Sequence, residues 1–170
     1  MNNIYLIGMM GSGKSSFGKK LASALKLHFV DLDKAIEKQS DKTISACFNE
    51  LGEEGFRKLE SAVLSGLSVQ DTVIACGGGT PCFYDNLNFM KQDGKIVYLK
   101  MAAKTISDRL KHSSSPRPLL QGLRGEALDS EILKLLYSRS YYYHQADIII
   151  DPLHLHAGQF ADYLSLFYSR

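Results

Sequence analysis

The 170-residue sequence predicts an α/β fold in one domain, with a parallel sheet between layers of helices. Short apolar runs of strand length are separated by longer stretches in which apolar residues recur at helical spacing, which is typical of strand–helix units. In the first unit, a glycine-rich loop at 8–15 leads from an apolar run at 4–7 into a helical stretch that reaches residue 25. With 45% hydrophobic residues, a chain of this length can bury a substantial core.

Charge and composition argue against several classes of protein. Twenty Lys and Arg residues face 18 Asp and Glu residues, and the net charge of +2 does not favour a nucleic-acid-binding protein. The three cysteines, an odd number without metal-ligand spacing, indicate reduced thiols in a reducing compartment. The apolar runs are too short for a secretory signal or a membrane span. We therefore expect a cytoplasmic monomer that binds small molecules and neither nucleic acids nor membranes.

The loop at 8–15 reads Gly-Met-Met-Gly-Ser-Gly-Lys-Ser and fits G-x-x-x-x-G-K-[ST] between a strand and a helix. Its glycines let backbone N–H groups close around an anion, and the following helix presents its positive end to the same anion. Lys14 can reach the β- and γ-phosphates, and the Ser15 hydroxyl can bind Mg²⁺. A glycine-rich turn without a ligand is the alternative, and the strand–helix context disfavours it. The residues expected to bind the nucleoside triphosphate here are Gly11, Ser12, Gly13, Lys14, Ser15 and Ser16.

Two carboxylates end the second expected strand, at 28–33. On an extended backbone Asp31 and Asp33 point to the same side, and the end of a parallel strand would place them beside the phosphate loop. Such a pair can hold Mg²⁺ directly or through water, and can orient a substrate hydroxyl. The alternative for Asp33 is the N-cap of the next helix.

Residues 34–51 predict two short helices with a break near Ser40, and the helix after them carries an Arg–Glu pair. Glu60 lies at the edge of its apolar face, about 40° from Phe56 at 100° per residue. An inward-leaning carboxylate needs a partner, and Arg57 could supply one while offering its remaining donors to a ligand carboxylate. A surface ion pair of little energetic consequence remains equally compatible with this spacing.

The expected buried strand at 72–76 ends in Gly77, Gly78 and Gly79. Three successive glycines lose much backbone entropy on folding, so either a ligand lies against bare backbone or the segment is a mobile turn. Residues 85–92 are expected to form a helix and residues 95–99 another strand.

A helix near 103–111 contains Arg109, and the irregular stretch at 112–125 that follows is long enough for an active-site lid. Within this stretch Arg117 lies between two prolines, as a cation on a stiffened segment suited to meeting a transferring phosphate. The alternative is an exposed loop arginine.

The C-terminal part predicts a helix, a strand and a second helix. The first helix, at 130–145, carries Arg139. We expect most of its apolar residues to face inward, namely Ile132, Leu133, Leu136 and Tyr137. Tyrosines 141–143 are expected to be packing residues. A strand at 147–150 then leads to an amphipathic helix with Ala157, Phe160, Ala161 and Leu164 inward. His154 and His156 lack the further ligands that a metal site requires.

Taken together, these features resemble the shikimate kinase family over nearly the whole chain. Phe-Arg-x-x-Glu, then Gly-Gly-Gly, then Arg-Pro-Leu is far more specific than the phosphate loop alone. The matching segments are Gly8–Ser15, Asp31-x-Asp33, Ile44–Phe48, Gly52–Glu60, Gly77–Gly79, Arg117-Pro118-Leu119 and Arg139-x-x-Tyr142-x-x-x-Ala146-Asp147.

The resemblance implies a three-layer α/β/α fold of the P-loop kinase type, with a five-stranded parallel sheet in the order 2-3-1-4-5. It implies one domain over 1–170, with a substrate-binding region at about 33–61 and a mobile lid at about 112–125. It also implies transfer of the γ-phosphoryl group of ATP to the 3-hydroxyl of shikimate with Mg²⁺, a transferase step in aromatic amino-acid biosynthesis.

The resemblance further implies roles for individual residues. Asp33 would hold the shikimate hydroxyls and would orient the attacking one, with removal of its proton as an open alternative. Arg57 and Arg139 would clamp the shikimate carboxylate. Glu60 would anchor Arg57. The glycine turn would offer backbone N–H groups to the substrate. The remaining roles are Mg²⁺ binding by Ser15 and Asp31, stabilisation of the transferring phosphoryl group by Lys14 and Arg117, and adenine stacking by Arg109 with the segment after Asp151.

Two departures from the family pattern lie near the glycine turn. Cys76 replaces the commoner Thr or Ser, and Thr80-Pro81 replaces a commoner pair of small apolar residues. Neither removes a residue assigned to chemistry. Two other functions are also compatible with the sequence: a kinase of another small hydroxy acid such as gluconate, and an inactive binding module regulated by nucleotide.

Overall fold

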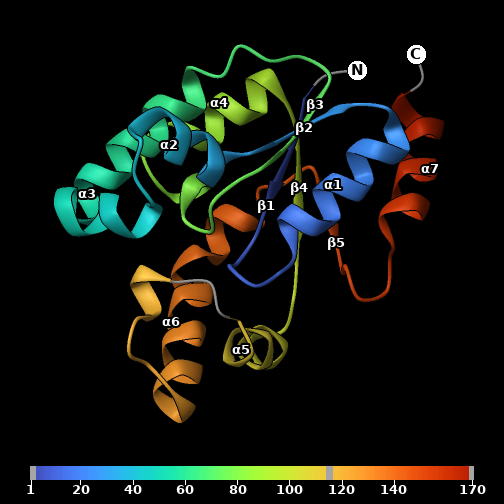
Figure 1. Cartoon of the computed structure of the whole chain (residues 1–170). Coiled ribbons are helices and arrows are strands. Elements are labelled where there is room, and N and C mark those ends of the chain that lie inside the picture. The colour runs from blue at the N-terminus through green and yellow to red at the C-terminus, as the bar shows by residue number, and fades with distance from the viewer. Residues whose placement is uncertain (1–2, 114–116, 169–170) are drawn as a thin grey trace.

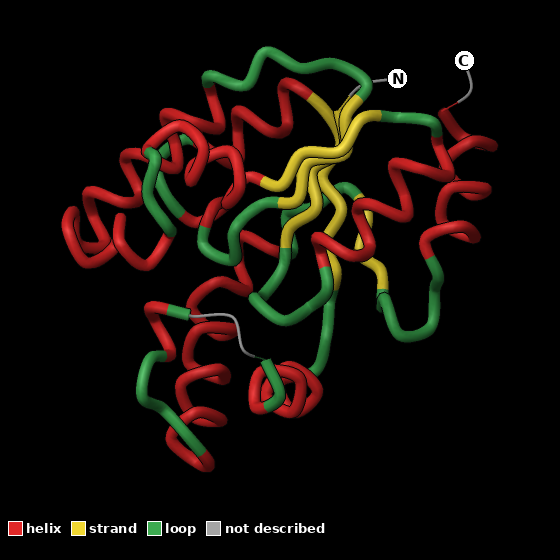
Figure 2. The backbone as a smooth tube through the Cα atoms, viewed as in Figure 1, coloured by secondary structure: helices red, strands yellow, loops and turns green. Residues whose placement is uncertain are grey.

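The computed structural model describes residues 3–113 and 117–168. Its sheet has five parallel strands in the order β2-β3-β1-β4-β5, which confirms the expected α/β class and strand order. Figure 2 shows the strands side by side in the centre with helices on either side. The strands are β1 (Asn3–Ile7), β2 (His28–Asp31), β3 (Thr72–Ala75), β4 (Gly94–Leu99) and β5 (Ile148–Ile150).

Helices cover both faces of this sheet (Figure 1). The α-helices are α1 (Lys14–Leu25), α2 (Leu32–Ser40), α3 (Ile44–Ser65), α4 (Asn86–Asp93), α5 (Ala103–Lys111), α6 (Gly125–Tyr143) and α7 (Ala157–Tyr168), and the short 3₁₀ helices are η1 (Thr80–Cys82) and η2 (Pro118–Leu120). Within the described residues, no helix combines the length and apolarity that a membrane span requires.

Three apolar clusters hold the layers together. On one face, Phe17 and Leu21 of α1 pack with Phe160 of α7 against strand residues. On the other face, side chains of α2, α3, α4 and the end of α6 pack against the same strands. A third cluster joins α5, η2 and α6 to Met9 of the glycine-rich loop. The loop is therefore fixed between the sheet and the pair α5–α6 by burial of apolar surface, the main stabilising term in folding.

The second strand is shorter than its sequence suggested. It ends at Asp31, and Asp33 lies in the first turn of α2, so the prediction that both carboxylates stand on extended backbone is wrong. The N-cap of α2 is Asp31, whose Oδ1 accepts a hydrogen bond from the Lys34 amide at 3.3 Å. Aspartate satisfies the free amides of a helix N-terminus well, and this local bond ends the strand.

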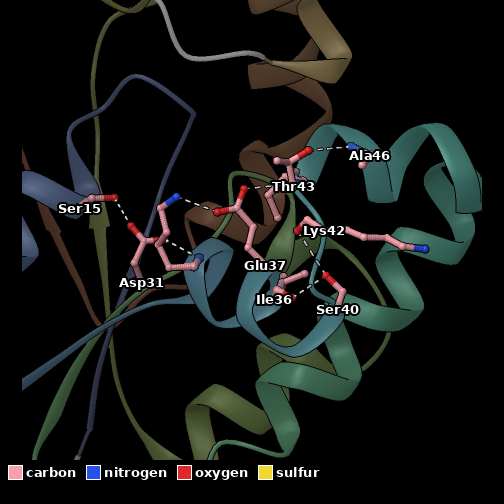
Figure 3. Close-up of polar contacts among 10 residues, drawn as sticks. Ser15, Asp31, Ile36, Glu37, Ser40, Lys42, Thr43 and Ala46 are labelled. Atoms are coloured by element: carbon pink, nitrogen blue, oxygen red, sulfur yellow. Dashed lines mark hydrogen bonds and ion pairs between the residues drawn. The ribbon is translucent and has the colours of Figure 1, made fainter.

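The expected break between two short helices lies at the junction of α2 and α3. Ser40 Oγ bonds the Ile36 carbonyl at 2.8 Å, and Thr43 Oγ1 caps α3 by accepting from the Ala46 amide at 3.2 Å (Figure 3). Glu37 Oε1 also accepts from the Ile44 amide at 3.2 Å, which ties α2 to the start of α3. Further along, Gly52 interrupts α3 with φ 68° and ψ 179°. This backbone conformation is open essentially to glycine alone.

Helix α6 faces the core with a different stripe from the one expected. Ile132 is buried, but Leu133 is 58% exposed and Tyr137 is 87% exposed, so their predicted inward orientation is wrong. The helix begins at Gly125, five residues before the expected start, and its buried side includes Leu128, Ile132, Arg139 and Tyr143. Two of the residues on the outer side are therefore large and apolar, which is why their types alone misled the prediction.

Candidate active site

A cavity of about 240 Å³ lies where the carboxyl ends of β1 and β3 meet the first turns of α1 and α2. Ligands bind at this edge of a parallel sheet in open α/β folds. Its walls include Lys14, Ser15, Asp31, Asp33, Gly77, Gly78 and Arg117. The structure thus brings together residues that are separated by up to about a hundred positions in the chain.

The glycine-rich loop wraps the N-terminus of α1. At Gly8 the backbone has φ +137°, and a Cβ there would lie 2.7 Å from the Leu99 carbonyl oxygen, so only glycine fits. Lys14 Nζ donates to the carbonyls of Gly8 at 2.8 Å and Met9 at 3.0 Å. Burial lowers the pKa of Lys14 to about 8, because its charged form is poorly solvated there. A phosphate anion would favour that charged form.

Ser15 and Asp31 form the part of the cavity suited to a divalent cation. Ser15 Oγ donates to Asp31 Oδ2 at 2.6 Å, and the two side chains point toward one another (Figure 3). A hydroxyl and a carboxylate are hard oxygen donors of the kind that Mg²⁺ takes beside phosphates. The pair therefore fits a magnesium ion in chemistry and in place.

Asp33 lies close to the glycine turn, where a Cβ on Gly77 would be 3.3 Å from its Oδ1. Burial raises the pKa of Asp33 to about 6, and the negative charges of Asp31 and Glu60 add to the rise. Lys14 and Arg117 partly oppose it. The carboxylate is thus held where its charge is disfavoured, a common property of functional groups.

Arg57 is buried at the other side of the glycine turn, and its pairing with Glu60 is not a surface contact. Its Nη1 donates to Glu60 Oε2 at 2.8 Å, and both side chains are 5% exposed or less. Its Nη2 lies 3.4 Å from Oε1 of the half-exposed Glu53. Among the described residues, its buried Nε has no hydrogen-bond partner. Donors therefore remain for a ligand carboxylate.

Aromatic rings also surround this guanidinium. Its Cζ lies 4.6 Å from the ring centroid of Phe83, 5.3 Å from that of Phe56 and 5.6 Å from that of Phe48. Rings at these distances attract a guanidinium through their negative faces. They hold Arg57 without occupying its hydrogen-bond donors.

The absence of side chains in the glycine turn lets both arginines approach the backbone. A Cβ on Gly79 would lie 2.5 Å from Arg57 Nη2, and one on Gly78 would lie 3.2 Å from Arg139 Nη1. The two guanidinium groups thus lie against neighbouring glycines of one turn, Arg57 at Gly79 and Arg139 at Gly78. This close approach is a physical reason for the glycines, which sequence reasoning left open between a ligand site and a mobile turn.

Tyr143 is a residue whose role sequence reasoning missed. It was expected only to pack, but its hydroxyl donates to the Gly78 carbonyl at 2.5 Å. Burial raises the pKa of Tyr143 above its usual range, so the hydroxyl keeps its proton and remains a donor. It lies one helical turn after Arg139 on the buried side of α6. That i, i+4 spacing from a candidate arginine was the available signal.

A second cavity, of about 450 Å³, lies beyond the loop. Arg109 lines it together with Ser12, Gly13, Ser16, Pro152 and His156, so the candidate adenine-stacking residue and the segment after Asp151 share one cavity. Arg109 Nη1 donates to the Gly11 carbonyl at 3.3 Å. Arg117 lines the first cavity and also a third of about 380 Å³, whose wall includes Ser45 and Asn49 of α3.

Comparisons with known proteins agree in sequence and structure. A family model described as shikimate kinase matches residues 10–166. The shikimate kinase of Parabacteroides distasonis is 41% identical over 152 residues, which cover 89% of this chain and 88% of the relative. That of Bacteroides thetaiotaomicron is also 41% identical over 152 residues, covering 89% of this chain and 87% of the relative.

Solved structures are similar along almost the full length. The crystal structure of the Bacteroides thetaiotaomicron shikimate kinase superimposes with a TM-score of 0.90 at 36% identity, covering 99% of both chains. A shikimate kinase from Acinetobacter baumannii in complex with shikimate gives 0.88 at 36% identity, covering 99% of this chain and 94% of the other. A gluconokinase from Sinorhizobium meliloti, at 16% identity and a TM-score of 0.58, shares the fold.

Proposed function

The chain belongs to the shikimate kinase family, and we propose that its active site transfers the γ-phosphoryl group of ATP to the 3-hydroxyl of shikimate. Kinases of this family are ATP-dependent phosphotransferases that act on a hydroxyl group, in the synthesis of aromatic amino acids. One observation carries the proposal: Asp33, Lys14 and the glycine turn share one cavity, and two buried guanidinium groups lie against that turn.

The acceptor is held at both ends. Arg57 and Arg139 bind the shikimate carboxylate beside Gly78, through charge-assisted hydrogen bonds to a group of matching shape. Glu60 holds Arg57 in place, and backbone N–H groups of residues 77–79 complete the contact. At the other end, Asp33 accepts a hydrogen bond from the attacking hydroxyl and directs its oxygen toward the phosphate loop. Asp33 is also the group that receives the proton of this hydroxyl.

The donor lies along the glycine-rich loop. Residues 11–16 bind the phosphates through backbone N–H groups and the start of α1. Lys14 and Arg117 stabilise negative charge on the transferring phosphoryl group, which needs positioning and charge neutralisation more than a strong base. Arg109 stacks on adenine in the second cavity. Ser15 and Asp31 would hold Mg²⁺, and the bound ion would neutralise phosphate charge.

We propose that residues 112–125, of which 114–116 lie outside the described residues, serve as a lid over the acceptor. Arg117, on the described part of this segment, lines the cavity that also contains Lys14 and Asp33. Its buried Nε has no hydrogen-bond partner within the described chain, so it is available for a phosphate oxygen. A closed lid would exclude water from the transferring group. The proposed domain is a single unit over 1–170, with an acceptor-binding region at about 33–61.

We also propose that the protein works as a monomer in the cytoplasm. The cysteines Cys47, Cys76 and Cys82 are free thiols, which suits a reducing compartment. Sedimentation at working concentration tests the monomer, since a stable dimer would show twice the mass.

A coupled assay of ADP release tests the function. With ATP and Mg²⁺, the wild-type protein should release ADP rapidly with shikimate, slowly with gluconate and almost not at all without an acceptor. Preferential turnover of gluconate would select the other hydroxy-acid kinase. ATP binding without turnover of either acid would select an inactive nucleotide-binding module.

A further inference from the structure

Thr80 directly follows the glycine turn and is completely buried. Its Oγ1 donates to Glu60 Oε1 at 2.7 Å, while the other oxygen of the same carboxylate, Oε2, accepts from Arg57 Nη1 at 2.8 Å. Glu60 is 1% exposed, so water cannot readily replace either donor. The Glu60 carboxylate is therefore held at both oxygens, by the turn on one side and by the arginine on the other.

This two-sided hold fixes the orientation of the arginine. The three phenylalanine rings around Arg57 attract its guanidinium but offer no acceptor for the hydrogen-bond donors in its plane. The hydrogen bond from Arg57 to the buried Glu60 Oε2, at 2.8 Å, is shorter than its contact with the half-exposed Glu53, at 3.4 Å. The Glu60 carboxylate, which Thr80 holds at its other oxygen, therefore sets the direction of the Arg57 donors. Without the Thr80 hydroxyl, Glu60 Oε1 would be a buried charged oxygen lacking this donor. The carboxylate would then rotate or move to find another.

Further bonds tie Thr80 to the surrounding helices. Asn86 Nδ2 donates to the Thr80 carbonyl at 2.9 Å, and Ser61 Oγ donates to Asn86 Oδ1 at 2.7 Å. Ser61 directly follows Glu60 on α3, and Asn86 begins α4. The chain of bonds thus joins α3, α4 and the turn, and it returns to the residue beside Glu60. Such a closed polar network restricts its members to one arrangement.

We propose that Thr80 is a positioning residue that sets Arg57 for the substrate carboxylate through Glu60. This rests on the proposed function, in which Arg57 binds that carboxylate. Thr80 itself touches neither substrate nor phosphate. Its hydroxyl acts on the affinity for the acceptor acid and leaves the affinity for ATP unchanged. Thr80 lines neither the cavity of about 240 Å³ beside the phosphate loop nor the cavity of about 450 Å³ that contains Arg109.

Two variants isolate the hydroxyl. Thr80→Ser keeps the oxygen and loses only the methyl group, and Thr80→Ala loses both, so the pair differs by one oxygen atom. We expect Thr80→Ala to raise the KM for shikimate about tenfold, the size for one hydrogen bond to a charged group. The KM for ATP and kcat should stay within about twofold, as for loss of an interaction made equally in ground and transition states. Thr80→Ser should remain close to wild type.

Thr72 supplies a matched control. It is a buried threonine on β3, its Oγ1 donates to the Gln70 carbonyl at 2.8 Å, and it lies at the other end of that strand. Thr72→Ser and Thr72→Ala should alter thermal stability without changing the KM for shikimate or for ATP.

If Thr80→Ala does not fold, Thr80→Cys replaces it, because a thiol is a weaker hydrogen-bond donor of similar size. The KM of Thr80→Cys for shikimate should lie above that of Thr80→Ser.

The outcomes separate the two proposals. Equal KM values for Thr80→Ser and Thr80→Ala, or for Thr80→Ser and Thr80→Cys, would overturn the role of Thr80 while leaving the shikimate kinase function intact. A parallel rise in the KM for ATP would also overturn it, since it would show a general loss of structure. Absence of shikimate-dependent ADP release in the wild type would overturn both.

Discussion

At the scale of the residue, Asp33, the proposed proton acceptor, lowers the stability of the folded protein at neutral pH. The folded-state pKa of Asp33 is raised to about 6 from an ordinary value of 3.8, so the folded state binds its proton more tightly than the unfolded state. The free energy of unfolding therefore falls as the pH rises from about 4 to about 6. In ligand-free protein without Mg²⁺, Asp33→Asn should therefore raise the free energy of unfolding by about 2 kcal/mol at pH 8. The gain should shrink toward zero near pH 3. Denaturant unfolding at several pH values measures it.

An exposed aspartate provides the control for that experiment. Asp162→Asn on the outer side of α7 should change stability by less than about 0.5 kcal/mol at any of these pH values. A pH-independent effect of Asp33→Asn would contradict the link between stability and the charge of Asp33.

The same Asp33→Asn variant should lose turnover. The new side-chain amide could still accept one hydrogen bond from the acceptor hydroxyl, but it could not take its proton, so kcat should fall at least about a hundredfold. ATP binding, measured by calorimetry, should be unchanged. Turnover close to wild type would remove Asp33 from the mechanism.

Arg57 should act on the acceptor rather than on the nucleotide. Arg57→Ala removes a buried guanidinium and leaves Glu60 without its charged partner, so the KM for shikimate should rise by about a hundredfold or more. Arg57→Lys keeps the charge but not the forked donor geometry, so its KM for shikimate should lie between those of the wild type and Arg57→Ala. Steady-state kinetics with each substrate varied in turn measures this. Equal weakening for shikimate and ATP would indicate misfolding or a wrong assignment.

Single positions also show where sequence reasoning reached its limit. Helical spacing placed Glu60 at the edge of an apolar face but could not decide between a buried pair and a surface pair. The decision depends on the ring of Phe83 and on the glycine turn, which pack around Arg57 from later parts of the chain. The bond from Tyr143 to Gly78 depends in the same way on two segments 65 positions apart.

At the scale of the element, the bend within α3 rests on one glycine. Gly52 adopts φ 68° and ψ 179°, and a Cβ there would meet no atom within 4 Å. Gly52→Ala should thus destabilise through backbone strain alone, by about 1–3 kcal/mol. Gly158→Ala is the control, because Gly158 also has open space around it and lies in the regular helix α7. That change should be neutral or stabilising. Denaturant midpoints compare the two, and equal effects would refute the strain argument.

Most element positions follow from local pattern, whereas their ends depend on side-chain bonds. The apolar run at 72–76 and the amphipathic stretch at 157–168 correspond to β3 and α7, with Phe160 and Leu164 inward as expected. The end of β2 was misplaced by two residues because the Asp31 cap is a competing local bond. In α6, the exposed Leu133 and Tyr137 imitate a buried stripe, so residue type alone gave the wrong face.

At the scale of the whole molecule, the parallel order of the strands did not follow from periodicity. It came from the combination of a phosphate loop, Phe56-Arg57-x-x-Glu60 and three glycines, which together resemble one family. Local pattern cannot order strands, because their pairing depends on contacts between distant segments. The cavity at the sheet edge then follows from topology, since β1 and β3 are neighbours and both end there.

The proposed lid at 112–125 should close fully only when the acceptor and the nucleotide are both bound. With shikimate and a non-hydrolysable ATP analogue bound together, amide hydrogen exchange across residues 112–125 should slow by about tenfold or more, because closure buries their amides. Either ligand alone should slow it less. Helix α7 should exchange at an unchanged rate and serves as the internal reference. Unchanged exchange across 112–125 with both ligands would contradict the lid.

Gly13 and Ser16 line both the cavity of about 240 Å³ and that of about 450 Å³. The two compartments therefore meet across one turn of backbone. A single inhibitor that joins a hydroxy-acid headgroup to a purine by a short tether would pass over these two residues. Because the second half would bind intramolecularly, at a millimolar effective concentration, two weak fragments could combine into a tight compound. The shared wall between the cavities thus gives the starting point for bisubstrate inhibitor design.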